Sequence, residues 1–131
     1  MITYAENKKL HAKDVAKVFK NSGIKRPYDD LDRIQRMIDH SDLIISAWDE
    51  NKLIGIARAI TDFSYCCYLS DLAVDQEYQN QSIGKNLVNR LQLLLGDETS
   101  LVLLSSPGAI HFYHKIGFEK SDKAFVIARK K

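Results

Sequence analysis

The chain has 131 residues, 45% of them hydrophobic and 27% charged, and its formal net charge at pH 7 is +2. This length suits one domain with its own hydrophobic core, and the composition excludes an intrinsically disordered chain. The near balance of charge argues against a nucleic-acid-binding protein, and no apolar run reaches the roughly 18 residues that span a membrane.

We therefore expect a single domain over residues 1–131 that binds neither nucleic acid nor membrane. The first residues, MITYAENKK, lack the apolar core of a signal peptide, so the expected location is the cytoplasm. The two cysteines, Cys66 and Cys67, are adjacent and poorly placed to bridge each other in a strand. We favour small buried strand residues over a catalytic thiol, and no metal site is expected because no His or Cys set has ligand spacing.

Hydrophobic periodicity predicts ten elements in the order β-α-α-β-β-β-α-β-α-β. They lie within residues 2–5, 11–23, 28–40, 43–48, 53–60, 65–74, 83–95, 101–104, 106–118 and 124–128. This order predicts an α/β (α+β) fold with three successive antiparallel strands, a right-handed β-α-β crossover and a last strand at the edge of the sheet.

Local signals mark several boundaries. Gly23 is expected to end the first helix, and Asp29 or Asp30 supplies the N-cap oxygen of the second. Ser106 is expected to cap the last helix, with Pro107 in its first turn. The run at 101–104 is a candidate for a fully buried strand.

The stretch DQEYQNQSIGKNLVNRL, residues 75–91, joins the strand YLSDLAV to an amphipathic helix. The first N–H groups of a helix lack partners within the helix, and glycine lets a ligand approach the backbone closely. This strand-to-helix turn therefore favours an anion-binding site, most simply for phosphate, over a plain surface turn.

Three stretches together resemble the GNAT superfamily of acetyl-CoA-dependent N-acyltransferases. LAVDQEYQNQSIGKNLV is similar to the acetyl-CoA motif Gln/Arg-x-x-Gly-x-Gly/Ala, AIHFYHKIGF to the tyrosine signature, and KLIGIARAI to the third family strand. The resemblance implies the GNAT fold, in which a central mixed, mostly antiparallel sheet has a bulged, splayed central strand and helices on both faces. It covers about the last 80 residues, and the first 40 match only in general shape.

The resemblance implies acetyl-CoA as cofactor. Backbone groups of Leu72 and Val74 would pair with the pantetheine arm, and the loop amides would hold the pyrophosphate, with Phe112 and Tyr113 beside the cofactor. The loop residues implied are Gln79, Asn80, Gln81, Ser82, Ile83, Gly84 and Lys85. Lys85 is alternatively a solvated helix residue.

Two residues depart from the family pattern. Ser82 stands where the motif has its first glycine, so we expect it to keep an ordinary right-handed dihedral angle and avoid strain. Ser106 stands where relatives often carry an Asn that binds the cofactor; it either takes that role or only caps the helix.

In the family a neutral amine attacks the thioester, and an oxyanion and a thiolate develop. The resemblance implies that the Val74 N–H binds the carbonyl and that Tyr113 protonates the departing sulfur. The alternative for Tyr113 is a packing ring.

The base is open. No Glu or His lies in the central strand, so the candidates are Asp71, Asp62, Tyr68 and Ser70. Strict alternation would put Asp71 on the face opposite Tyr68, unless the family bulge changes the phase. Asp62 and Asp71 are predicted to attract a cationic amine, whereas a structural role for Asp71 is the alternative.

Tyr28 and Trp48 would form part of the acceptor wall. The implied function is acetyl transfer to a small-molecule or peptide primary amine, by a monomer or homodimer. The alternatives are an acetyl-CoA-binding sensor without transfer and a GNAT-like fold that binds no CoA.

Overall fold

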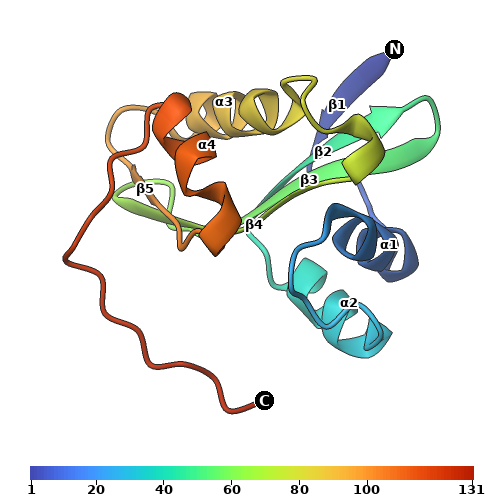
Figure 1. Cartoon of the computed structure of the whole chain (residues 1–131), viewed down its shortest axis with the longest axis horizontal. Helices are drawn as coiled ribbons and strands as arrows, with labels where there is room; N and C mark the ends of the chain where they lie inside the picture. The colour runs from blue at the N-terminus through green and yellow to red at the C-terminus, as the bar shows by residue number, and fades with distance from the viewer.

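The computed structural model describes residues 1–131 and contains one five-stranded sheet with helices on both faces (Figure 1). The strands are β1 (Ile2–Glu6), β2 (Leu43–Asp49), β3 (Lys52–Thr61), β4 (Cys66–Val74) and β5 (Ser100–Val102). The helices are α1 (Ala12–Ser22), α2 (Leu31–Asp39), α3 (Ile83–Leu95) and α4 (Ile110–Lys115), with short 3-10 turns η1 (Gln76–Tyr78) and η2 (Pro107–Ala109).

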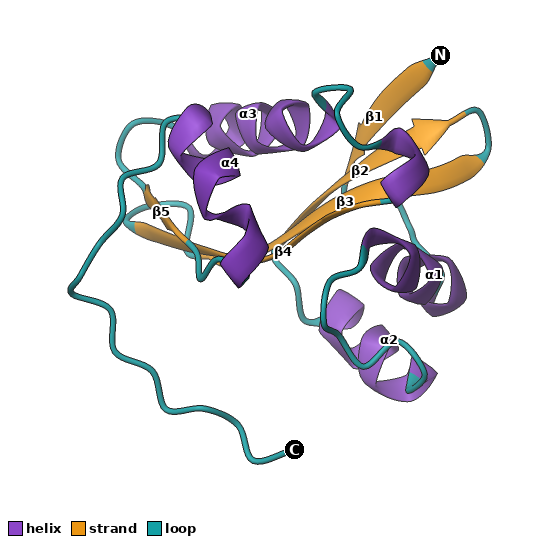
Figure 2. Ribbon diagram, in the orientation of Figure 1, coloured by secondary structure: helices purple, strands orange, loops and turns teal.

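The strands follow each other across the sheet in chain order. The pairs from β1 to β4 are antiparallel, and β4 pairs with β5 in parallel through the crossover helix α3. Helices α1 and α2 cover one face and α3 and α4 lie on the other, as Figure 2 shows. This confirms the predicted mixed α/β fold.

The predicted helix boundaries are confirmed where their signals are local. Gly23 follows α1 with a left-handed φ of 84°, a conformation that glycine adopts without steric cost. The side chain of Asp30 accepts a hydrogen bond from the Arg33 N–H at 3.1 Å and so caps α2. Helix α3 spans the predicted residues and ends at Gly96.

The sheet separates two hydrophobic clusters. One lies between the sheet and α3 and includes Leu87, Val88 and Leu91; the other lies under α1 and α2 and includes Phe19 and Ile34. Because both faces of β3 are covered, its side chains are buried almost without interruption.

Two strand predictions near the end of the chain are wrong. Strand β5 ends at Val102, and Val102 and Leu104 are half-exposed, so the run 101–104 is not fully buried. Residues 124–128 form no strand, because their backbone pairs with none of the five strands of the sheet. Cys67 is buried as expected and Cys66 is exposed, and both thiols are free.

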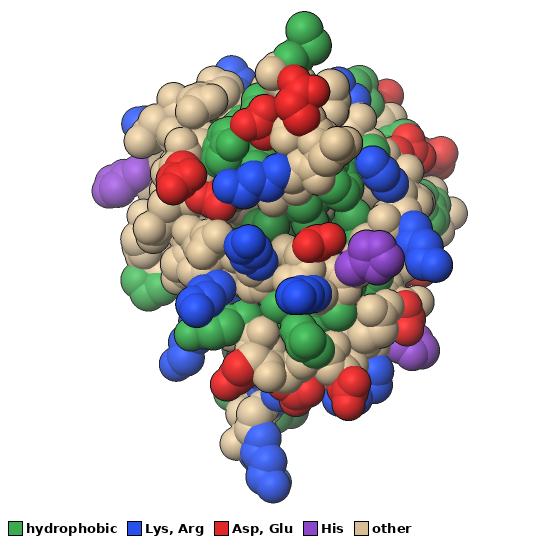
Figure 3. Space-filling view, turned by 90° about the vertical axis from the view of Figure 1, so that its right-hand side faces the viewer, with side chains coloured by type: hydrophobic (Ala, Val, Ile, Leu, Met, Phe, Trp, Pro, Cys, Tyr) green, Lys and Arg blue, Asp and Glu red, His purple; other side chains and the backbone are tan.

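The face of the molecule in Figure 3 mixes basic and acidic side chains around apolar areas. None of the helices has the length and hydropathy of a membrane span.

Candidate functional site

A bulge in β4 sets the geometry of the candidate site. In the pairing of β3 with β4, Arg58 lies opposite Asp71 and Ala59 lies opposite Leu69, so Ser70 has no partner. Before the bulge, the odd-numbered residues Cys67 and Leu69 face α3. After it, the odd-numbered residues Asp71 and Ala73 face α1 and α2. The bulge therefore brings Asp71 to the face of Tyr68, and strict alternation is wrong at this point.

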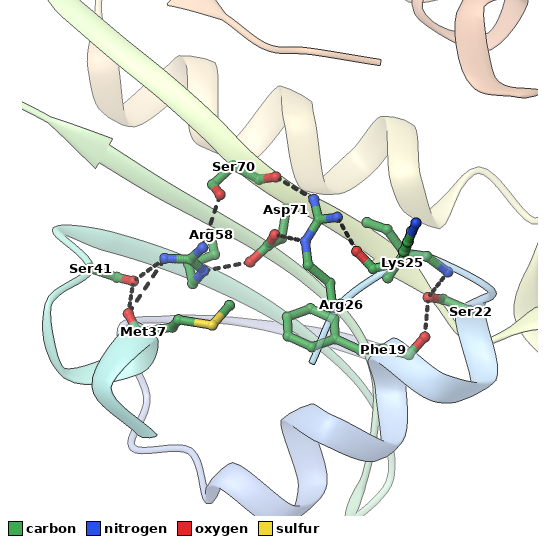
Figure 4. A network of polar contacts seen from close by, with 10 residues as sticks. Phe19, Ser22, Lys25, Arg26, Met37, Ser41, Arg58, Ser70 and Asp71 are labelled. Carbon is green, nitrogen blue, oxygen red and sulfur yellow. Dashed lines mark hydrogen bonds and ion pairs between the residues drawn. The ribbon is translucent and has the colours of Figure 1, made fainter. Parts of the chain in front are cut away.

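Asp71 lies between two guanidinium groups (Figure 4). Its Oδ1 accepts from Arg26 Nε and its Oδ2 from Arg58 Nε, both at 2.5 Å, and the carboxylate is fully buried. Ser70 completes the network, because its carbonyl accepts from Arg26 Nη2 and its hydroxyl from Arg58 Nη2. The three charged groups carry one net positive charge. Both oxygens of the Asp71 carboxylate are bound by arginines, as in a structural ion pair.

Asp62 lies in the turn between β3 and β4. Its Oδ1 accepts from the N–H groups of Ser64, Tyr65 and Cys66, and these bonds lower its pKa to about 2. The five residue steps from Cys66 to Asp71 span about 16 Å of strand. The structure therefore does not bring Asp62 and Asp71 together into an acidic pair.

The edge of β4 that faces β5 is unpaired beyond Tyr68, because the two strands pair only over Cys66–Tyr68 and Ser100–Val102. The Asp75 N–H donates to the Ile54 carbonyl, so alternate β4 residues direct their backbone groups toward β3. The residues between them, Leu72 and Val74, direct theirs to the open edge, where the Val74 carbonyl accepts a hydrogen bond from the Gln79 side chain. This edge can accept an extended polar chain as an additional strand.

The loop from β4 to α3 lies at the end of this open edge. None of the N–H groups from Asn80 to Lys85 donates a hydrogen bond within the protein. Gln79 fixes the loop, because its side-chain amide donates to the Val74 carbonyl at 2.9 Å. Six unpaired amides at the start of a helix of 13 residues form a site suited to an anion such as a pyrophosphate.

Ser82 adopts a left-handed conformation, with a φ of 63° and a ψ of 15°. The prediction of an ordinary right-handed angle is wrong, because the turn into α3 needs the angle that the glycine of the family motif supplies. Asn80 is also left-handed, with a φ of 67°. A non-glycine residue in this region costs roughly 1–2 kcal/mol, so the loop keeps its shape against local strain.

Gly84 permits the ring of Phe112 to pack on the first turn of α3. A Cβ at this position would lie 3.1 Å from Phe112 Cζ. Gly84 does not have a left-handed φ, so its backbone angle does not require glycine. Glycine is required because α3 and α4 pack closely at this position.

Tyr113 follows Phe112 on α4, with its ring edge-to-face against Phe118 at 5.5 Å between centroids. Burial raises the pKa of the Tyr113 hydroxyl, and the nearby charge of Arg26 opposes this effect. The hydroxyl thus stays protonated at neutral pH and can donate a proton or a hydrogen bond.

The other predicted residues are more scattered. Trp48 lies on β2, two strands from β4, and donates from Nε1 to the Ser46 hydroxyl. Tyr28 is exposed in the loop between α1 and α2, on the same segment as Arg26. Ser106 occupies the predicted N-cap position before Pro107, but its exposed hydroxyl makes no capping hydrogen bond. Lys85 is exposed on α3.

Sequence reasoning missed Arg26 and Arg58. The sequence does carry a signal for Arg58, because it is the one charged residue within the apolar run LIGIARAI and therefore needs a buried partner. Asp71 is likewise the one charged residue within YLSDLAV, so the two could have been paired. Arg26 comes from a loop far away in sequence and carries no such signal.

Comparison with known proteins identifies the family. Residues 8–128 match the model of the acetyltransferase (GNAT) domain. The chain is 31% identical over 103 residues to an uncharacterized N-acetyltransferase, ycf52, of Porphyra purpurea, covering 74% of this chain and 58% of that protein. It is 42% identical over 72 residues to the chloroplastic GCN5-related N-acetyltransferase 2 of Arabidopsis thaliana, covering 53% of this chain and 28% of that protein. The chain thus spans less than two thirds of the length of these relatives.

Solved structures share the fold. A probable acetyltransferase of meticillin-resistant Staphylococcus aureus has a TM-score of 0.87 at 18% identity, with 100% of both chains covered. An aminoglycoside N-acetyltransferase in complex with CoA has a TM-score of 0.72 at 17% identity, covering 100% of this chain and 96% of that one.

Proposed function

The chain belongs to the GNAT acetyltransferase family, and we propose that it transfers the acetyl group of acetyl-CoA to a primary amine. The observation that carries this proposal is the open β4 edge at Leu72 and Val74, which leads directly into the unpaired amides of residues 80–85. An extended pantetheine arm matches the edge, and a pyrophosphate matches the amides.

Catalysis then depends mainly on position and hydrogen bonding. The Val74 N–H would bind the thioester carbonyl and stabilise the developing oxyanion, while the Tyr113 hydroxyl would donate a proton to the departing thiolate. The C–S bond breaks as the C–N bond forms, and the amine loses a proton to solvent. The raised pKa of Tyr113 supports its role as donor, because the hydroxyl keeps its proton at the pH of the reaction.

The net charge around Asp71 affects which protonation state of the acceptor amine can bind. Because Arg26 and Arg58 outnumber Asp71, the network attracts no cation, and a nearby positive charge lowers the pKa of a bound ammonium. We propose that the amine enters the site in its neutral form, so that the reaction requires no dedicated protein base. Rates should then rise with pH toward the pKa of the free amine.

Replacement of Tyr113 by Phe tests the proposal. We expect turnover to fall by about 10²–10⁴-fold, the usual effect of a lost general acid, with acetyl-CoA affinity unchanged by calorimetry. The assay uses thioester cleavage against a library of polyamines, aminoglycosides and peptide amines, since neighbours of the same fold are named aminoglycoside acetyltransferases. Tyr65→Phe, at a ring that is 78% exposed just before β4, is the matched control.

Equal turnover in Tyr113→Phe and wild type would assign Tyr113 a packing role only. Tight acetyl-CoA binding without acetylation of any amine by the wild type would favour a sensor that binds the cofactor and transfers nothing.

A further inference from the structure

The two arginines that bind Asp71 differ in how far the protein uses their donors (Figure 4). Arg58 is buried, and all of its guanidinium nitrogens donate to groups of the protein. The Arg26 side chain is 25% exposed. Its guanidinium makes three hydrogen bonds, to Asp71 Oδ1 and to the carbonyls of Ser70 and Lys25, although a guanidinium carries five N–H groups. Arg26 therefore keeps donors for a group that the protein does not supply.

The charge of this network is also unbalanced. Asp71 is the one acidic residue that forms an ion pair with either arginine, so one positive charge is left over. Since Arg58 is buried, the accessible part of this charge belongs to Arg26. A partly buried cation with unused N–H groups favours an anion, and a carboxylate suits it because a guanidinium binds carboxylates through charge-assisted hydrogen bonds.

The chain holds Arg26 in place without a ligand. Arg26 precedes Pro27, and a proline restricts the residue before it to an extended backbone. The Arg26 carbonyl accepts a hydrogen bond from the Tyr28 N–H at 2.8 Å, and Asp71 binds the guanidinium itself. A guanidinium that is already ordered loses less conformational entropy when it binds a ligand, so Arg26 is prepared for recognition.

Arg26 lies beside the region proposed for acetyl transfer. Its Nη2 binds the Ser70 carbonyl, two residues before Leu72 in β4. The pairing of β4 with β5 ends at Tyr68, so the sheet is open beside Ser70. Tyr113 is close enough for the charge of Arg26 to oppose the rise in the pKa of its hydroxyl. The unbalanced charge is therefore near the group proposed to protonate the leaving sulfur.

We propose that the acceptor is an amino acid, and that Arg26 binds its carboxylate while its amine attacks the thioester. This inference rests on the proposed acetyl transfer and names the class of acceptor for it. An amino acid with a neutral amine is an anion, so it balances the positive charge that Arg26 and Arg58 leave over. The C–N bond forms as the C–S bond breaks, the amine loses a proton to solvent and the thiolate gains one. The products are an N-acetyl amino acid and CoA.

Acceptors that differ only in the carboxylate test the proposal. Each of a panel of α-amino acids, with β-alanine and 4-aminobutyrate, is compared with its own amide at equal concentrations of neutral amine. We expect kcat/KM of the wild type to be at least tenfold higher for the best acid than for its amide, because the amide cannot form charge-assisted hydrogen bonds with Arg26. The length of the best acid also reports how far the attacking nitrogen lies from the guanidinium.

Arg26→Gln should lose the preference for the acid, with kcat/KM for the amides little changed. Asp71 still pairs with Arg58 in this variant, so it should fold, which circular dichroism checks. Arg26→Lys keeps the charge with fewer donors and should show an intermediate preference, which tests the site even if Arg26→Gln is unstable. The matched control is Arg36→Gln, at an exposed residue in the last turn of α2, which should prefer the acid as the wild type does.

Calorimetric titration of the CoA complex with the same acids and amides measures the contact without turnover. Tighter binding of acids than of amides that Arg26→Gln abolishes would support the carboxylate site even if no amine is acetylated, and only the transfer would then fail. Acetylation of amines with no preference for acids would overturn the carboxylate site and leave the transfer standing. A preference that Arg26→Gln retains would also overturn it.

Discussion

Two polar regions lie along β4 and differ in whether their hydrogen-bonding groups have partners. Around the bulge, the Asp71 carboxylate binds Arg26 and Arg58, and those arginines also bind both polar groups of Ser70. At the other end, the amides of residues 80–85 bind nothing within the protein, and two residues of the loop are left-handed.

The difference separates structure from ligand binding. A polar network in which the carboxylate and both guanidinium groups have hydrogen-bond partners holds elements together, here β3, β4 and the loop between α1 and α2. Unpaired amides that are held in place by strained backbone are ready for an anion that the chain itself does not supply. Four changes, from the largest expected effect to the smallest, test this distinction.

The largest effect is expected for Asp71→Asn. Loss of the carboxylate leaves the buried Arg58 guanidinium unpaired, so the free energy of unfolding should fall by about 3 kcal/mol, measured by urea denaturation. Asp32→Asn, at an acidic residue exposed in the first turn of α2, is the control and should cost little. A variant as stable as the wild type would mean that Asp71 is no structural group and would return it to the list of catalytic candidates.

Gly84→Val addresses the region of unpaired amides. A side chain at this position pushes the Phe112 ring away from α3 and crowds the loop, so acetyl-CoA affinity should fall at least tenfold, or about 1.4 kcal/mol. Gly108→Val is the control, because no atom lies within 4 Å of a Cβ there. Equal affinities of the folded variants by calorimetry would remove the loop from the cofactor site.

Ser82→Gly tests the strain in the same loop. Glycine accepts the left-handed conformation without steric cost but loses more entropy on folding, so the net gain in stability should be below about 1 kcal/mol. Ser106→Gly is the control, because its φ of −64° offers no strain to relieve, and this variant should not gain stability. A loss of stability in Ser82→Gly would show that the serine side chain contributes more than its backbone angle costs.

The smallest effect concerns Asp62, which is partnered like Asp71 but exposed. Its pKa is lowered from 3.8 to about 2, so its charge stabilises the fold above pH 3.8, and this contribution is lost as the pH falls toward 2. The melting temperatures of wild type and Asp62→Asn should therefore converge over that interval. Asp122→Asn, in the exposed tail, should show no such convergence; parallel curves for Asp62→Asn would contradict the role of the turn hydrogen bonds.

Several helices could be predicted because their signals are local. Gly23 and Asp30 mark helix ends through contacts within a few residues, and the apolar period of α3 reports its buried face directly. The position of the loop before α3 followed from the same local pattern, as did the family resemblance.

The tertiary structure decided what depends on distant partners. The bulge at Ser70 turns Asp71 toward α1 and α2, and only the register of β3 with β4 and the loop at Arg26 show that the carboxylate is paired. Ser82 is left-handed because the turn into α3 requires it, although its residue type favours another angle.

Residues 124–128 also show that local sequence does not determine which segments pair. Their composition is that of a strand, but a strand exists only where its backbone pairs with a neighbouring strand, and residues 124–128 pair with none. Periodicity records which side chains avoid water; which distant backbone and charged groups meet is set by the pairing of strands and the packing of loops across them.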